Sequence, residues 1–291
     1  MSRIVLIRHA SWADPASSQT VDTAAAALEQ GSVLFLPHLA FGVGAGEQQI
    51  FSPDILAASK NTSFEPETGH VGGSTLKGPE LERLRRLVGR FSHQTAQLVD
   101  QLLPRYRGQI VRARASFRPA EIAGRQTSWR KDDTRLHVDS FPASPVQGRR
   151  ILRVFSNVNP SQRPRAWRVG GDFAAVAARF EPKLRMPLPG AGVVLRALQI
   201  TKARRSPYDS LMLQLHDRMK ADAEFQERSE QEPFEFPAGS TWLAFTDAVS
   251  HAATSGQYQL EQTFLLPVRA MIDEQRSPLR VLERLKQRSL A

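Results

Sequence analysis

The pattern of hydrophobic and polar positions divides the chain into a helical first third and a remainder that is rich in strands. Apolar side chains recur at helical spacing over residues 79–103, and the proline that follows predicts the end of a long helix. Residues 20–30 predict a shorter helix that ends at a glycine, and residues 32–37 predict a buried strand. Residues 42–79 are rich in Gly, Ser, Asn and Pro and are predicted to form ordered loop.

The pattern changes after residue 108, where short segments of alternating or β-branched residues are separated by turn residues. Strands are predicted over residues 110–117, 135–141, 149–158, 233–237, 241–245 and 259–267. Helices are predicted to begin near Ser206 and Ser277, because each precedes a proline that suits the first helical position. The expected fold class is therefore mainly β with flanking helices (α+β), built around an antiparallel sandwich or barrel.

We expect one domain over residues 1–291. Within it, residues 1–108 form a helix-containing N-terminal flank, residues 109–268 the β core and residues 269–291 a basic C-terminal helix. No apolar run approaches the roughly 18 residues of a membrane span. The apolar stretch before Arg8 is also shorter than the roughly 7–15 residues that a signal peptide needs. A soluble intracellular protein is the expectation.

Composition narrows the possible chemistry. The chain has no cysteine, which excludes a disulfide scaffold, a cysteine nucleophile, a zinc-thiolate site and an iron–sulfur cluster held by its own thiolates. Lys and Arg exceed Asp and Glu by 39 − 29 = 10. This basic balance favours an anionic partner, which is a nucleic acid, an acidic membrane surface or an acidic substrate.

A His-x-Asp pair at His137 and Asp139 is the strongest candidate for chemistry. Residues i and i+2 of a strand share a face, so both side chains are placed to bind one metal. A turn, a buried strand and a second turn over residues 236–250 then present His251, 114 residues beyond His137 (251 − 137). These three residues match the two-histidine, one-carboxylate triad of non-haem Fe(II) oxygenases, which leaves positions for O2 and a co-substrate. The separation suits a double-stranded β-helix, or jelly roll, that closes onto one metal.

Three alternatives remain open beside the triad. Arg8 and His9, at the end of a strand, resemble the opening of histidine phosphatases, and His251 resembles the second histidine of that family, although Ala10 replaces the usual glycine. The net charge keeps a nucleic-acid-binding protein in view, but the chain shows no helix-turn-helix signal and no zinc knuckle. A jelly-roll binding module without catalysis is the third alternative.

Two longer segments identify a family. Residues 128–142 and residues 148–160 resemble Kdo 3-hydroxylases, where Kdo is 3-deoxy-D-manno-oct-2-ulosonic acid, and residues 60–63 and 165–170 also fit this family. The resemblance spans roughly residues 30–270. It implies a dioxygenase that uses Fe(II), 2-oxoglutarate and O2 to hydroxylate Kdo at C3 in a Kdo-containing lipid A. We expect a cytoplasmic enzyme that is peripheral on the inner face of the inner membrane and does not bind nucleic acid; its oligomeric state stays open.

The residue that anchors 2-oxoglutarate is less obvious. Many relatives have an arginine about ten residues after the distal histidine, where this chain has Glu261 and Gln262. Arg153 lies 14 residues after Asp139 (153 − 139), on a predicted strand, and a guanidinium suits a carboxylate. We therefore predict Arg153 as the anchor, with Asn157 on the same strand face as a second co-substrate contact. The rival candidates are Arg130 and Arg135.

Basic side chains before the triad predict the substrate-binding rim. Kdo carries a carboxylate and the lipid carries phosphates, so we expect the polar and basic residues of this segment to contact them. The predicted contacts are Arg125, Ser128, Arg130 and Lys131. The alternative is an ordinary basic surface. Asp132 and Asp133 are expected to pair with these bases rather than to bind metal.

The C-terminal segment, residues 277–291, predicts an amphipathic helix. Val281, Leu282 and Leu285 form an apolar stripe, and arginines and lysines surround it. One interpretation is a helix docked on the body of the protein through this stripe. The other is a helix that lies on an anionic cytoplasmic membrane surface.

Overall fold

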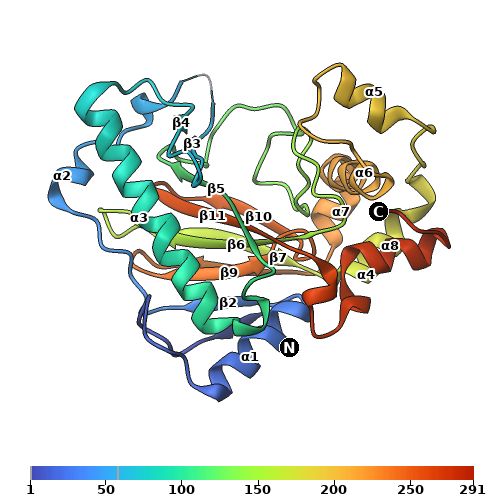
Figure 1. Cartoon of the computed structure of the whole chain (residues 1–291), viewed down its shortest axis with the longest axis horizontal. Coiled ribbons are helices and arrows are strands. Elements are labelled where there is room, and N and C mark those ends of the chain that lie inside the picture. The colour runs from blue at the N-terminus through green and yellow to red at the C-terminus, as the bar shows by residue number, and fades with distance from the viewer. Residues whose placement is uncertain (1, 58) are drawn as a thin grey trace.

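The centre of the protein consists of two β-sheets packed face to face, with helices around them (Figure 1). The computed structural model describes residues 2–57 and 59–291. The large sheet has the strand order β1-β2-β9-β6-β11-β5-β3-β4, and the small sheet has the order β10-β7-β8. The strands are β1 Ile4–Leu6, β2 Val33–Leu36, β3 Thr62–Phe64, β4 Val71–Gly72, β5 Val111–Arg118, β6 Arg150–Asn157, β7 Arg165–Gly170, β8 Gln231–Phe236, β9 Thr241–Phe245, β10 His251–Ser255 and β11 Gln259–Leu266.

Strand β6 lies in the middle of the large sheet, antiparallel to β9 on one side and to β11 on the other. All eight of its residues are buried, so both faces of the strand are covered by protein. Alternate side chains therefore point into two different parts of the interior instead of into core and solvent. Leu152 and Val154 face the core beneath the helices. Arg153 and Phe155 take the opposite face, toward the small sheet, and this parity brings Arg153 into the space between the sheets.

Aromatic rings hold the two sheets together. Trp167 of β7 packs edge-on against Trp242 of β9, with ring centroids 5.7 Å apart, and edge-on against Phe155 of β6 at 5.1 Å. Phe236 of β8 stacks on Trp242 at 4.1 Å. Large flat side chains fill the layer between facing sheets, and their burial fixes the distance between the sheets at this end.

Helices α1 and α3 cover the large sheet, and helices α4 to α8 are grouped at one side of the sheets (Figure 1). Helix α3 has a proline in its first turn and buries one stripe that includes Leu84, Phe91 and Leu98. Helix α6 begins at a capping box between Ser206 and Asp209. The helices are α1 Ser18–Glu29, α2 Ala45–Gln48, α3 Gly78–Leu102, α4 Phe173–Phe180, α5 Ala191–Ala197, α6 Pro207–Ala221, α7 Ala223–Arg228 and α8 Pro278–Lys286.

Most predicted elements are present within one or two residues, but one predicted strand is wrong. Residues 135–141 form no strand; His137 makes only an isolated bridge to His251. Beyond it the pairing stops, and the Asp139 N–H donates to the carbonyl of Thr246 at 2.7 Å instead of continuing a ladder with β10. The segment still runs close enough to β10 to place its side chains beside those of that strand.

The N-terminal part is more than a helical flank. Residues 1–108 supply β1 and β2 at one edge of the large sheet and β3 and β4 at the other. The predicted loop over residues 42–79 also contains the short helix α2. The protein is thus mixed α/β with a large sheet. Its helical content is higher than the predicted mainly β class implies. No helix in the described part of the chain is both long enough and apolar enough to cross a membrane.

Candidate active site

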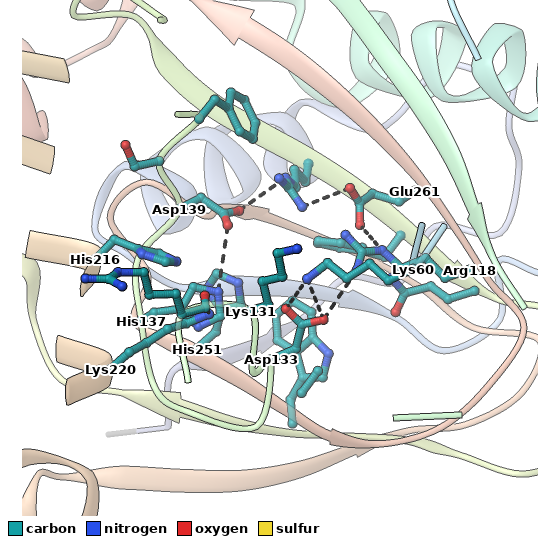
Figure 2. A pocket seen from close by; sticks show the side chains of 18 of the residues that line it. Lys60, Arg118, Lys131, Asp133, His137, Asp139, His216, Lys220, His251 and Glu261 are labelled. Atoms are coloured by element: carbon teal, nitrogen blue, oxygen red, sulfur yellow. Dashed lines mark hydrogen bonds and ion pairs between the residues drawn. The ribbon is translucent and has the colours of Figure 1, made fainter. Parts of the chain in front are cut away.

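A cavity of about 290 Å³ opens between the two sheets beside helix α6, and Figure 2 shows the side chains around it. Its walls come from segments that are far apart in the sequence. They consist of Lys60, Arg118, Arg130, Lys131, Asp133, His137, Asp139, Ser140, Phe141, Pro142, Arg153, Phe155, Arg165, Trp167, His216, Lys220, His251, Ala253, Gln259 and Glu261. Among them are seven Lys or Arg side chains and three carboxylates, so the cavity carries an excess of positive charge that suits an anionic ligand.

The three predicted triad residues come together in this cavity. One possible ligand atom from each of His137, Asp139 and His251 lies within 4.8 Å of the other two. The backbones of the two histidines are tied by reciprocal hydrogen bonds, since each N–H donates to the other's carbonyl at 2.8–3.0 Å. His137 Nε2 lies 3.9 Å from Asp139 Oδ1. Two nitrogens and one carboxylate oxygen at this spacing form a donor set that fits one divalent metal ion.

Both histidines are oriented for metal binding by their second ring nitrogen. His137 Nδ1 lies 2.7 Å from the carbonyl of Arg135, and His251 Nδ1 lies 2.8 Å from the carbonyl of Val249. A carbonyl can only accept, so each Nδ1 carries the proton and each Nε2 keeps its lone pair. The His251 ring also stacks on Trp167, with centroids 5.0 Å apart.

The charge states of the triad agree with this donor set. Burial and the neighbouring His251 lower the pKa of His137 well below its ordinary value, and burial also lowers the pKa of His251. Burial alone would raise the pKa of Asp139, but Arg153 and the two histidines hold that pKa far below its usual range. Near neutral pH the site therefore presents two neutral imidazoles and one carboxylate, which are the protonation states that a metal requires.

Arg153 lies directly behind Asp139. Its Nε is 3.2 Å from Asp139 Oδ2, and its Nη1 donates to Glu261 Oε1 at 2.8 Å. The other oxygen of Glu261 accepts from Arg118 Nε at 2.9 Å. Arg153 therefore has two carboxylate partners within the protein, one of them from the triad, and its charge attracts the Asp139 carboxylate although no hydrogen bond joins Nε and Oδ2.

The chain of ion pairs continues to the rim of the cavity. Lys60 Nζ donates to Asp133 Oδ1 at 2.6 Å and to Oδ2 at 2.9 Å, and Arg118 Nη1 lies 3.7 Å from the same carboxylate. Burial and the nearby Arg118 lower the pKa of Lys60 despite this ion pair. The cationic partners of Asp133 hold its pKa below the usual range, against the effect of burial. Of the neighbouring bases predicted as its partners, only Arg125 approaches Asp133, at 4.0 Å, and its closer partners Lys60 and Arg118 come from distant segments.

Arg165, at the start of β7, differs from the other arginines of the cavity. It is buried, its Nη1 donates to the carbonyl of Gly256 at 2.8 Å, and its Nε has no hydrogen-bond partner among the residues that the structure describes. In the part of the chain that the structure describes it forms no ion pair with a carboxylate. Burial and the neighbouring Arg118 lower its pKa to about 9. A buried guanidinium without an anion is costly, so this side chain is free to receive an anionic group from a ligand.

The other predicted contacts are only partly brought together. Arg130 and Lys131 line the cavity, whereas Arg125 and Ser128 are not among its described lining residues. Asn157, predicted as a co-substrate contact, also lies outside that lining. Its amide instead donates to the carbonyls of Arg163 and Phe236 and serves the turn after β6, which makes the side chain structural.

Several lining residues were missed by sequence reasoning. Lys60 and Arg165 lie inside the two short segments that supported the family resemblance, so that signal marked them without assigning a role. His216 of α6 also lines the cavity, and its ring packs 5.2 Å from that of His137. Arg118 and Lys220 carried no local signal at all, since each reaches the cavity through tertiary packing.

The phosphatase alternative requires Arg8 and His9 to share a site with His251. The structure does not bring them together: Arg8 and His9 line a separate cavity with His38, and His251 faces His137 instead. The residues that this alternative needs therefore do not form one site.

The comparisons with known proteins agree with the geometry of the cavity. A model of the 3-deoxy-D-manno-oct-2-ulosonic acid (Kdo) hydroxylase family matches residues 11–289. The chain belongs to the Kdo hydroxylase family. The family resemblance predicted from the sequence is thereby confirmed. None of the curated proteins compared with the chain matches it.

Solved structures of a Kdo hydroxylase resemble this family member closely. The crystal structure of KdoO with cobalt(II) is 45% identical, has a TM-score of 0.97 and aligns over 99% of this chain and 97% of that chain. The structure of KdoO with α-ketoglutarate and Fe(III) is 44% identical, with a TM-score of 0.96 and the same coverage. KdoO is described as a non-heme Fe(II) α-ketoglutarate-dependent dioxygenase.

Proposed function

We propose that this Kdo hydroxylase family member is an Fe(II)- and 2-oxoglutarate-dependent dioxygenase that hydroxylates Kdo at C3 in a Kdo-containing lipid A. The observation that carries the proposal is the His137, Asp139 and His251 donor set, which lies in a cavity rich in basic side chains. The likeness to KdoO, which binds iron and α-ketoglutarate, supports it.

His137, Asp139 and His251 would hold the Fe(II) ion. When bound, the metal would supply the activation of O2, driven by the oxidative decarboxylation of 2-oxoglutarate to succinate. The protein supplies geometry. The carbonyls of Arg135 and Val249 fix the tautomers of the two imidazoles. The guanidinium behind Asp139 attracts the carboxylate, and the aromatic layer between the sheets closes one side of the cavity to water.

We further propose that Arg165, in place of the predicted Arg153, receives the distal carboxylate of 2-oxoglutarate. Arg153 has its charge balanced by Asp139 and Glu261, whereas Arg165 has no carboxylate partner among the described residues. A dianionic co-substrate would neutralise this buried cation. Two parallel hydrogen bonds from a guanidinium to a carboxylate are the geometry that arginine provides and lysine does not.

The sugar acid would bind at the outer part of the same cavity. Arg130 and Lys131 lie at its rim, and we propose them as contacts for the Kdo carboxylate or the lipid phosphates. Arg125 and Ser128 remain proposed contacts from the neighbouring loop. Arg125 is also within 4.0 Å of Asp133 and contributes to the positive field around the opening.

A double-stranded β-helix is the fold that we propose for the core, within a single domain. The order β5-β11-β6-β9 in the large sheet faces the residue-137 segment, β10, β7 and β8 in the small one. Neighbouring strands thus alternate between early and late parts of the core, as a jelly roll requires. This winding would bring His251 back beside His137.

We place the enzyme at the cytoplasmic face of the inner membrane, as a peripheral protein. The lipid A substrate that we propose resides in a bilayer, and the chain has a formal charge of +10 that would attract it to an anionic surface.

The test is succinate formation from 2-oxoglutarate with a Kdo-lipid A acceptor and Fe(II), together with mass analysis of the product. We expect acceptor-dependent succinate and a product that gains one oxygen at C3. His137→Ala, Asp139→Ala and His251→Ala should each reduce turnover at least a hundredfold, because a triad that loses one ligand loses most of its affinity for the metal.

The matched control is His38→Ala, a histidine that lines the separate cavity at β1 and should leave turnover unchanged. Full activity in any one of the three triad variants would contradict the proposed ligand set. Succinate formation without an oxygenated Kdo product would contradict the substrate.

A further inference from the structure

Large apolar side chains are exposed together on one small part of the surface. Among the residues that the structure describes, eight large hydrophobic side chains are exposed, and five of them fall within residues 188–200. These five are Leu188 at 80% exposed, Val193 at 54%, Val194 at 56%, Leu198 at 65% and Ile200 at 54%. We name residues 188–205, which include helix α5, the α5 segment. A monomer rarely leaves such a cluster bare without a partner for it.

The α5 segment is held firmly at its base while its apolar residues point outward. A Cβ on Gly192 would lie only 2.1 Å from the carbonyl oxygen of Arg205, so the helix packs directly against the returning chain. The Lys202 N–H donates to the carbonyl of Ala143 at 2.8 Å, and Arg205 Nη2 donates to the carbonyl of Pro142 at 2.5 Å. In Figure 1, α5 stands at the outer edge of the molecule above α6.

The charged side chains of the chain segment that carries the exposed apolar residues have a single sign. No Asp or Glu occurs between Glu181 and Asp209. The exposed basic residues of this stretch are Lys183, Arg185, Arg196, Lys202 and Arg204. A segment with exposed apolar side chains and basic side chains, and with no acidic residue, suits the interface of an anionic bilayer. There the apolar side chains meet the lipid acyl chains and the basic side chains meet the phosphates of the head groups.

The position of the segment relates it to the cavity. Pro142, whose carbonyl accepts from Arg205, lines the candidate active site directly beyond the His137-x-Asp139 pair. A bilayer that contacts the α5 segment would therefore lie on the side of the molecule where Pro142 lines the cavity.

The C-terminal helix cannot fill this role. Its apolar stripe packs against the body of the protein: Leu279, Val281 and Leu282 are buried in the core beside α4 and α6, and the half-buried Leu285 packs against the same core. The interpretation of α8 as a helix lying on the membrane is thus corrected by the structure, because the side chains that would enter the bilayer are already packed.

We propose that the α5 segment docks the protein on an anionic lipid bilayer, with Leu188, Leu198 and Ile200 entering the head-group region and the flanking arginines and lysines facing lipid phosphates. The proposal rests on the proposed function for its biological sense, since a lipid-borne Kdo brings the enzyme to a membrane. The docking surface itself is tested without catalysis.

The experiment is sedimentation of the full-length, Fe(II)-loaded protein with vesicles of phosphatidylglycerol and phosphatidylcholine in equal parts, and with phosphatidylcholine alone. We expect binding to the anionic vesicles only, weakened by salt. The apolar pair Leu198→Ser with Ile200→Ser should reduce the partition coefficient at least tenfold. The charge pair Arg196→Glu with Lys202→Glu should also reduce it at least tenfold, since each base contributes on the order of fivefold.

The matched controls are Ile272→Ser, which removes an equally exposed apolar side chain elsewhere, and Arg228→Glu, which reverses an exposed charge outside the segment. Both should bind as the unaltered protein does. Thermal unfolding checks that the variants fold, and if the apolar pair does not, the charge pair decides. Unaltered protein that stays in the supernatant, or α5 variants that sediment like the controls, would overturn the proposal.

Two further measurements separate the explanations. If the apolar pair converts a dimer of the unaltered protein to a monomer on size exclusion and leaves vesicle binding intact, the segment is an interface between copies and the proposal fails. If vesicle binding is lost as expected, turnover of a Kdo acceptor embedded in vesicles should fall while turnover of a soluble Kdo acceptor stays the same. Absence of turnover with every Kdo acceptor would contradict the proposed function and leave the sedimentation result standing.

Discussion

Two buried arginines in the same cavity have opposite electrostatic situations. Arg153 lies between the carboxylates of Asp139 and Glu261, so its charge is neutralised inside the protein. Arg165 is also buried, but among the described residues its side chain has a hydrogen bond only to a carbonyl. In the sequence, Arg153 and Arg165 are both arginines on strands. Only their partners in the structure show that Arg153 is paired with a triad residue and that Arg165 is available to a ligand.

This difference predicts different kinetic effects. Arg165→Ala should raise the KM for 2-oxoglutarate about tenfold or more, because a charge-assisted contact contributes roughly 1.5–3 kcal/mol. Arg165→Lys should recover only part of this loss, since lysine cannot form the paired hydrogen bonds. Arg153→Ala should instead weaken metal binding, measured by titration with Co(II), because Asp139 loses its restraint. A large rise in KM for Arg153→Ala, with Arg165→Ala unaffected, would restore the anchor predicted from the sequence.

At the scale of single elements, helix α8 shows how an amphipathic pattern can be satisfied internally. The helix is capped by Ser277, whose side chain accepts from the Arg280 N–H, and its apolar side meets α4 and α6. Lys286 Nζ donates to Glu181 Oε1 at 2.5 Å and to the carbonyl of Leu184 at 2.9 Å. One of the basic side chains of α8 therefore also points toward the body of the protein.

Truncating the buried stripe should destabilise the fold. Leu282 is fully buried, so Leu282→Ala should lower the free energy of unfolding by about 2–5 kcal/mol through lost contacts and a cavity. Leu198→Ala, which shortens a side chain that is 65% exposed, should change it by less than about 0.5 kcal/mol. Urea unfolding of the three proteins measures both. Equal stability of Leu282→Ala and the unaltered chain would show that α8 does not dock as described.

At the scale of the whole molecule, the candidate metal site joins segments that are far apart in the sequence and come from both sides of the space between the sheets. His137 and Asp139 lie on the segment beside β10, and His251 is the first residue of that strand. Arg153 reaches the same point from the large sheet. The three ligands meet only in the folded protein. A bound metal would therefore stabilise the folded state and not the unfolded chain.

This link predicts a metal-dependent stability. Co(II), the ion present in one KdoO structure, should raise the Tm of chelator-treated protein by several degrees when it is added well above its Kd, because a hundredfold excess contributes about 2.7 kcal/mol. His251→Ala should show no such rise. Differential scanning calorimetry of both proteins, with and without Co(II), measures the effect. An equal rise in the His251→Ala protein would place the metal elsewhere.

The sequence by itself determined the local elements and the ligand types. Helical spacing identified α3, turn residues and alternation identified β5, β6, β9 and β11, and the His-x-Asp pair with a distant histidine identified the candidate triad. These features are readable because each depends on periodicity or on residues only two positions apart. The same local pattern predicted a strand over residues 135–141. That prediction failed because, after a single bridge to His251, the Asp139 N–H bonds to the carbonyl of Thr246 instead of continuing the ladder.

Only the tertiary structure decided which charges meet. Glu261 accepts from Arg118 across 143 positions of sequence, and Lys60 reaches Asp133 across 73. Such pairs follow from strand register and loop packing, and no spacing rule encodes them. The same holds for the surface: α5 and α8 are both apolar and basic in sequence, but packing buries the stripe of one and leaves the apolar residues of the other exposed. Burial depends on what else the chain brings alongside a helix, so the local pattern alone does not contain it.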